Sequence, residues 1–161
     1  MRRSQFDDSG WPAQWARVRR WHRRLDRIRG APPAKGAPGE PEALDEILAF
    51  FSNCYHLVDW LKNDRVDPRP EARAFVHRTE ALLVCRDLAN GSKHCLLESG
   101  SRRVPASTYP NMTTTAETIV DSLAVARWLV EVEPGDRRDM FDLADQCVEA
   151  WRGFIDGLRP D

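Results

Sequence analysis

The feature that most constrains the fold is a helical repeat of apolar side chains between positions 42 and 62. Apolar residues recur there at steps of three and four: Leu44, Ile47, Leu48, Phe51, Cys54, Tyr55, Val58 and Leu61. At about 100° per residue they share one broad face, and polar residues occupy the opposite one. The repeat predicts an amphipathic helix over about 42–62 that buries one face in a core.

Two further segments show the same period at the ends of the chain. Residues 12–28 predict a helix that begins at Pro12, a favoured first-turn position, and stops at Gly30. Its apolar stripe contains Trp11 and Trp15, followed by Trp21 or His22 at the next turn. Residues 137–158 predict a closing helix with a buried apolar face.

The segment 71–97 contains Asn90-Gly91, a dipeptide typical of turns. A helix that continues through it gathers one apolar face from Val84, Cys85, Leu88, Ala89, Cys95 and Leu96. A mid-helix glycine costs only about 1 kcal/mol relative to alanine. We therefore expect one uninterrupted helix over 71–97, in which Gly91 lets another backbone or a ligand approach closely.

The region between this helix and the last is rich in β-branched residues. We expect an irregular connection over 101–116 and a hairpin with strands near 117–123 and 126–132. A helix across 117–129 is the alternative, and Pro134-Gly135-Asp136 predicts a turn. The fold class is thus mainly α, a helical bundle of about four principal helices with room for a small β-hairpin before the last helix.

Charge and composition suggest three regions. Nine arginines and three aspartates give residues 1–29 a net charge of +6, and because the whole chain carries −1, the other 132 residues carry −7. A Pro/Gly-rich linker over 30–41 follows, and 42–161 forms the helical bundle domain. The basic amphipathic N-terminal helix therefore predicts an anionic partner or an intramolecular clamp.

The chain shows no secretory signal, and its apolar runs are too short for a membrane span. Its four cysteines are scattered without a C-x-x-C pair, at Cys54, Cys85, Cys95 and Cys147. That spacing argues against a zinc site and predicts buried, reduced thiols in a cytoplasmic protein. No metal or cofactor is expected.

One polar patch lies on the exposed side of the 42–62 helix and contains Ser52, His56, Asp59 and Asn63. A helix face offers neither a strained nucleophile turn nor an oxyanion hole, so a hydrolytic triad is excluded. Two ligands, His56 and Asp59, are too few for a metal. We expect these two side chains to pair or to meet solvent.

A second polar patch follows the 71–97 helix and contains Arg86, Asp87, Asn90, Lys93 and His94. Two cations, an amide and an imidazole on one face suit a phosphate, and His94 could exchange protons during phosphodiester cleavage. A merely solvated helix face is the alternative. A straight antiparallel hairpin would separate His56 from His94 by roughly 25–30 Å, so the two patches are expected to be independent.

The arginine side of the first helix carries Arg17, Arg20, Arg24 and Arg27. It could follow a nucleic-acid backbone, or the helix could lie on an anionic membrane surface. In a third interpretation the tryptophans pack on the bundle and the arginines meet the acidic body.

The stretches "FFSNCYHLVDWLKND" and "CRDLANGSKH" resemble a paired signature of small, mostly uncharacterised bacterial and phage proteins. The likeness covers about residues 48–97 and the closing "CVEAWRGF". More remotely, a helical pair with arginine and histidine on its second helix is similar to HEPN domains. These are helical bundles, often dimeric, and many are metal-independent ribonucleases of toxin–antitoxin and antiviral systems.

The HEPN resemblance implies roles for individual residues. It carries over Arg86, Asn90 and His94, and the dimer typical of the family would bring His94 next to its symmetry mate. The ribonuclease hypothesis built on it uses His94 as acid and base, Arg86 and Lys93 to hold phosphate, and Asn90 to position the substrate. The HEPN motif places four to six residues between arginine and histidine, whereas Arg86 and His94 enclose seven. The sequence thus leaves two functions open: a HEPN-like ribonuclease or RNA-binding protein, and a non-catalytic protein–protein interaction module that docks through the Arg/Trp helix.

Overall fold

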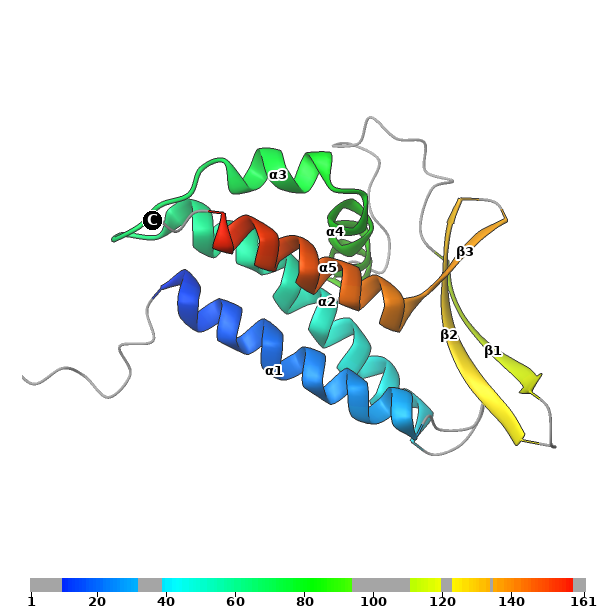
Figure 1. Ribbon diagram of the computed structural model, residues 1–161. Helices are drawn as coiled ribbons and strands as arrows, with labels where there is room; N and C mark the ends of the chain where they lie inside the picture. Colours follow the sequence, from blue (N-terminus) through cyan, green and yellow to red (C-terminus); the bar gives the residue numbers. More distant parts are fainter. Residues whose placement is uncertain (1–9, 32–38, 94–110, 120–122, 134, 158–161) are drawn as a thin grey trace, which may run out of the picture.

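The computed structural model describes residues 10–31, 39–93, 111–119, 123–133 and 135–157. Its elements in chain order are α1 (Trp11–Gly30), α2 (Glu40–Asn63), α3 (Ala72–Arg78), α4 (Glu80–Lys93), β1 (Asn111–Ile119), β2 (Leu123–Glu133), β3 (Asp136–Asp139) and α5 (Met140–Asp156). Helices α1, α2 and α5 lie side by side, α4 crosses them, and the strands stand at one end of the bundle (Figure 1). The prediction of a mainly helical bundle with a small β element before the last helix is confirmed.

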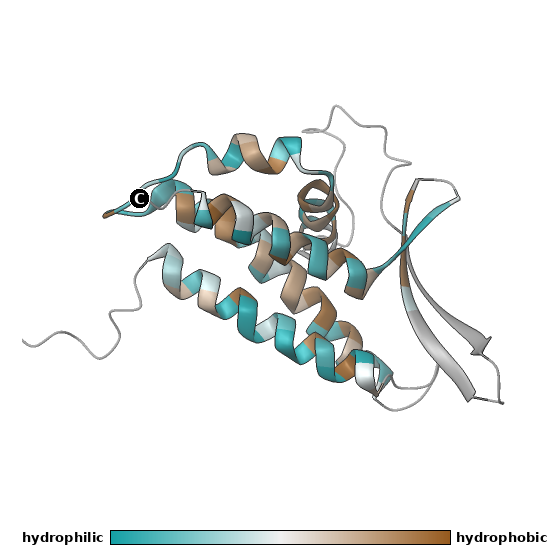
Figure 2. Ribbon diagram, viewed as in Figure 1, coloured by the Kyte–Doolittle hydropathy of each residue, from teal (hydrophilic) through white to brown (hydrophobic). Residues whose placement is uncertain are grey.

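The core is built from the apolar faces of α1, α2, α4 and α5. Helix α2 contributes the largest set, and Phe50, Phe51 and Leu57 of this helix have no exposed surface. Trp151 of α5 is equally buried, and Val18 of α1 joins the same cluster. In Figure 2 the hydrophobic residues of α2 and α4 contrast with the largely hydrophilic ribbon of α1. One hydrophobic core therefore includes the N-terminal helix.

Polar contacts also hold α1 on the bundle. The carboxylate of Asp64, just after α2, accepts a hydrogen bond from the backbone N–H of Trp11 at 2.9 Å. Gln14 is 1% exposed and donates through Nε2 to the backbone oxygen of Asn53 at 2.8 Å. Together with the packing of the tryptophans against the core, these bonds agree with the third interpretation of this helix, at least for its apolar side.

The expected single helix over 71–97 is broken at Thr79. Its backbone is extended, with φ −111° and ψ 107°, and its carbonyl accepts the N–H groups of Leu82 and Leu83 at the start of α4. Threonine favours this position at a helix start, so the prediction of one helix was wrong there. The estimated separation of His56 from His94 assumed a straight hairpin and loses its basis.

Helix α4 does run through Asn90 and Gly91 as predicted, and its described part ends at Lys93. The predicted continuation to residue 97, including Cys95, lies outside the described residues. A Cβ atom added to Gly91 would meet no described atom within 4 Å. Close approach of another described segment therefore does not explain this glycine.

The strands form one antiparallel sheet in the order β1-β2-β3. Strand β1 pairs with β2 from Asn111↔Glu131 to Ile119↔Leu123. A strand therefore occupies 111–116, where an irregular connection was predicted. The helical alternative over 117–129 is wrong as well. Gly135, between β2 and β3, has φ +85°, a conformation that favours glycine. The buried residues Trp128 to Val130 of β2 attach the sheet to the core, and α5 begins at Met140, after β3, instead of at 137.

Candidate functional site

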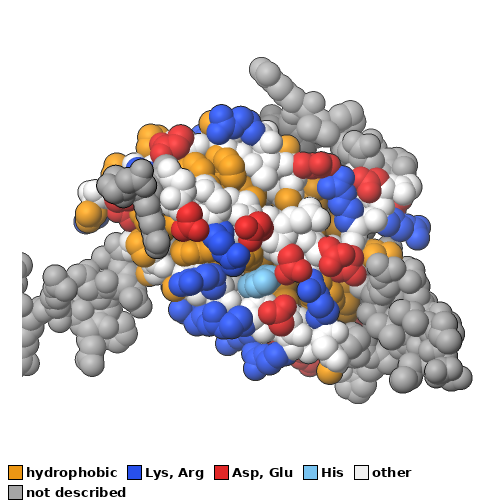
Figure 3. Space-filling view, in the orientation of Figure 1, with side chains coloured by type: hydrophobic (Ala, Val, Ile, Leu, Met, Phe, Trp, Pro, Cys, Tyr) orange, Lys and Arg blue, Asp and Glu red, His pale blue; other side chains and the backbone are white. Residues whose placement is uncertain are grey.

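An open pocket lies along the arginine side of α1. It encloses about 910 Å³ and is lined by Arg17, Arg20, Trp21, Arg23, Arg24, Arg27 and Asn53. We call this set the arginine pocket. All four arginines predicted to bind nucleic acid are in it, and Arg23 was missed. Figure 3 shows arginine and lysine side chains gathered along the part of the surface that α1 forms.

Helical spacing explains why these arginines converge. Positions 17, 20, 24 and 27 follow one another at steps of three, four and three, so they lie on one side of α1. Val18 and Leu25 point the other way and are buried in the core. Burial of the apolar stripe therefore fixes the direction of the arginines, which span about 15 Å along the helix axis.

Two tryptophans make cation–π contacts with pocket arginines, and Trp21 also lines the pocket itself. The guanidinium of Arg24 lies 4.4 Å from the ring centroid of Trp21, and that of Arg17 lies 5.8 Å from the ring of Trp60 on α2. Trp21 and Trp60 are half-buried, so each presents an aromatic surface beside a cation. The sequence placed Trp21 only on the apolar stripe and did not link Trp60 to this helix.

The charges of the arginine pocket are not neutralised by described acidic residues. Arg17 donates to the side-chain oxygen of Gln14. Within the described ranges, no carboxylate lies within ion-pair distance of Arg20, Arg23, Arg24 or Arg27. Arg29, by contrast, contacts Asp145 at 2.9 Å. The expected pairing with the acidic body is thus found at Arg29 and not in the pocket.

In the second predicted patch, on α4, the described cation has an acidic partner. Arg86 donates through Nε to the neighbouring Asp87 carboxylate at 2.9 Å, and both side chains are half-buried together with Asn90. His94 and the side chain of Lys93 are outside the described part of the chain. The described patch therefore contains a paired cation, and the full set of five predicted residues is not described.

The polar patch of α2 (Ser52, His56, Asp59 and Asn63) lies on the same helix as Tyr55. Burial raises the pKa of the Tyr55 hydroxyl; Arg86 opposes the rise and Asp59 adds to it. His56 and Asp59 are exposed, and no hydrogen bond joins these two side chains in the structure.

A histidine–aspartate pair that the sequence analysis missed lies between α1 and α5. His22 Nε2 is 2.6 Å from a carboxylate oxygen of Asp145. Burial disfavours the charged form of Asp145, but hydrogen bonds from His22 and Arg29 outweigh it and lower the pKa of this carboxyl. Because the partners are 123 positions apart, no local pattern could reveal them. The pair attaches α1 to α5.

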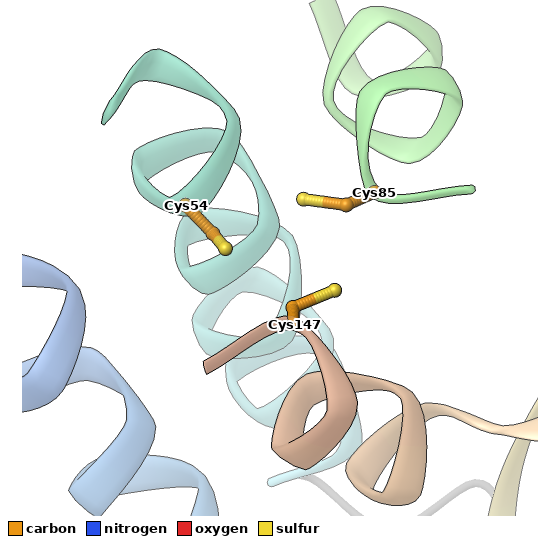
Figure 4. Close-up of side chains that lie close together, drawn as sticks. All are labelled: Cys54, Cys85 and Cys147. Carbon is orange, nitrogen blue, oxygen red and sulfur yellow. The ribbon is translucent and has the colours of Figure 1, made fainter. Parts of the chain in front are cut away.

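The structure also brings together three of the four cysteines. Cys54, Cys85 and Cys147 are buried, as predicted, but their sulfur atoms lie within 4.8 Å of one another (Figure 4). Cys85 and Cys147 each donate to a backbone oxygen, of Phe51 at 3.4 Å and of Ala81 at 3.3 Å. Burial raises the pKa of both thiols. Their gathering depends on how three helices pack, which the sequence spacing does not show.

A scan of protein-family models and searches of curated proteins and of solved structures found no match to this chain. Among the described residues, no helix combines the length and the apolar character that crossing a membrane would require.

Proposed function

We propose that this protein binds single-stranded RNA through the arginine pocket of α1. The observation that carries this proposal is that five arginines line one open pocket beside an aromatic ring, while none of the five has a carboxylate partner among the described residues. Cations held this close together repel one another, and an anionic ligand relieves that repulsion. A row of phosphates supplies the required charge over the length of the pocket.

The tryptophans favour a single-stranded nucleic acid over other anions. Proteins that bind single strands combine a basic groove with aromatic rings on which bases stack. Trp21 and Trp60 could provide such rings next to Arg24 and Arg17. A membrane surface is less suitable, because insertion needs a free apolar face, and the apolar stripe of α1 is packed on the core.

The proposal is tested by fluorescence anisotropy with the full chain and a labelled single-stranded RNA of mixed sequence. Reversing two pocket charges, in Arg20→Glu with Arg24→Glu, is expected to weaken binding by on the order of 100-fold. The control is Arg152→Glu, at an exposed position of α5 outside the pocket. Equal affinity of the double variant and the wild type, or no binding by the wild type, would contradict the proposal. A DNA strand of the same sequence measures the preference for RNA.

A second candidate function is metal-independent cleavage of the bound RNA. Its support is the helical course of α4 through Asn90 and Gly91, which puts Arg86 and Asn90 one turn apart on the same side. In this proposal His94 transfers protons, Lys93 and Arg86 hold phosphate, Asn90 positions it, and a homodimer pairs the two His94 side chains. Cleavage of total RNA by the wild type but not by His94→Ala supports the proposal. If neither protein cleaves RNA, the cleavage proposal is rejected. The proposal of RNA binding is then judged by the anisotropy experiment alone.

A further inference from the structure

We propose that Cys54, Cys85 and Cys147 form a binding site for a soft metal ion, Cu(I), at the point where α2, α4 and α5 meet. We call these residues the cysteine cluster. One cysteine comes from each helix, and the three side chains point toward a common space (Figure 4). Their sulfur atoms lie within 4.8 Å of one another.

The sulfur spacing is close to that of a metal thiolate site. A metal–sulfur bond is about 2.3 Å long, so three sulfurs around one ion lie roughly 3.8–4.0 Å apart. The cluster therefore needs a contraction of less than about 1 Å. Rotation about the Cα–Cβ bonds of three neighbouring cysteines could supply it without a change in the helix packing.

The number and type of ligands favour Cu(I) over Zn(II). Thiolates select soft ions such as Cu(I) and zinc, and a structural zinc site has four protein ligands. Among the described residues, no fourth histidine, cysteine or carboxylate belongs to the cysteine cluster. A three-sulfur site suits an ion that accepts a low coordination number. On binding, each ligating thiol loses its proton to solvent, so one Cu(I) releases up to three protons.

The surroundings contain a polar group that a thiolate would satisfy. The indole N–H of Trp151 has no hydrogen-bond partner, although the side chain is completely buried. Trp151 follows Cys147 by one turn of α5, so the indole and this thiol lie on the same side of the helix. N–H groups directed at metal-bound ligands commonly stabilise such sites. The bonds of Cys85 and Cys147 to backbone oxygens would be lost, but these oxygens belong to helices and keep their helical N–H partners.

The three cysteines are not accessible from the surface, since Cys54, Cys85 and Cys147 all have 0% exposure. An ion must therefore enter while the chain folds or when α5 opens locally. For this reason, the test loads the full chain by refolding it from urea without oxygen, with Cu(I) supplied as its bicinchoninate complex. A parallel sample receives Zn(II).

Bound metal is measured after gel filtration by elemental analysis, and sulfur coordination by X-ray absorption. We expect one Cu(I) per chain in the wild type and in the control Cys95→Ser, and at least a tenfold loss in Cys54→Ser, Cys85→Ser and Cys147→Ser. Cysteine-to-alanine variants with native circular dichroism separate loss of ligand from loss of fold. No bound Cu(I) in the wild type, retention in the folded cluster variants, or cluster-dependent binding of Zn(II) in place of Cu(I) would overturn the proposal.

Discussion

The arginine pocket and the polar patch of α4 (Arg86, Asp87, Asn90, Lys93 and His94), here called the α4 patch, come from the same sequence pattern. They differ in whether a described carboxylate neutralises their cations. Both were predicted from cations that share one helix face. In the pocket, Arg20, Arg23, Arg24 and Arg27 have no described carboxylate partner, whereas Arg86 is joined to Asp87 at 2.9 Å. The comparison shows that cations sharing one helix face can be left without a carboxylate partner or can be paired by a neighbouring residue, which the sequence pattern alone does not distinguish.

The difference coincides with where the acidic residues of each helix lie. Asp26 is the one acidic residue within α1, and its carboxylate lies within 4.8 Å of both His22 and Asp145 of α5. Asp87 directly follows Arg86 and can turn back to it. The position of a single carboxylate relative to the arginines therefore decides whether a cationic helix face keeps its charge available to an external anion.

Among the single substitutions, the largest loss of RNA affinity is expected from removing Trp21, the aromatic side chain that lines the pocket. Trp21→Ala should weaken RNA binding by about 10- to 100-fold, because stacking contributes about 1–3 kcal/mol per base. The matched control is Trp15→Ala. The guanidinium of Arg19 lies 5.7 Å from the ring centroid of Trp15, but Trp15 does not line the pocket. Anisotropy titrations that gave equal losses for both variants would show that the helix, and not the pocket, had been damaged.

A direct comparison of the two regions uses one alanine in each. Arg24→Ala should lower the RNA affinity by about five- to tenfold, the loss expected for one phosphate contact with its stacking partner. Arg86→Ala should change it by less than about twofold, because the Asp87 carboxylate already neutralises this cation. The ranking is read from dissociation constants at one salt concentration, and a reversed ranking would refute the comparison.

The pocket also depends on the attachment of α1 through Asp64. Hydrogen bonds from the backbone N–H groups of Asp67, Trp11 and Val66 lower the pKa of this carboxyl, so its contribution to stability is present above its ordinary pKa and declines as the pH falls through the lowered value. Asp64→Ala should cost about 1 kcal/mol at pH 7. Urea unfolding at pH 7 and below pH 4 measures both effects. A cost that stayed constant with pH would contradict this role, and Asp64→Asn separates loss of charge from loss of the acceptor.

The smallest change in RNA affinity is expected when Arg86 loses its acidic partner. Asp87→Asn removes the neighbouring negative charge and should raise RNA affinity by about twofold. The control is Glu80→Gln, which removes one negative charge elsewhere on α4. Glu80 contacts Arg138 of β3 and not Arg86. An unchanged affinity for Asp87→Asn would mean that the α4 patch lies out of reach of the bound strand.

The helices were predictable where their apolar repeat was long and uninterrupted. The repeats of α1, α2 and α5 bury one face each, and their ends differ from the predicted ends by a few residues. The break at Thr79 was missed because its neighbours continue the apolar repeat, while one residue with a preference for helix starts changes the direction of the chain. Strand β1 was missed over its first half because Thr113 to Thr115 are polar, although threonine favours strands.

The candidate site was predictable only within one helix. The spacing of Arg17, Arg20, Arg24 and Arg27 on α1 was enough to place them together. Contacts between helices were not predictable, because they depend on packing: the contact of Arg17 with Trp60 and the meeting of the cysteines both join elements that are distant in sequence. Pairing and proximity across helices are therefore the information that the structure adds.

The central claim is that the free arginines of α1 contact phosphates, and the salt dependence of RNA binding tests it most directly. For a single strand, the logarithm of the association constant falls with the logarithm of salt concentration at a slope of about −0.7 per phosphate contacted. Five pocket arginines predict a slope of about −3.5 for the wild type and a much shallower slope for Arg20→Glu with Arg24→Glu. A wild-type slope near zero, or the same slope in both proteins, would contradict the account.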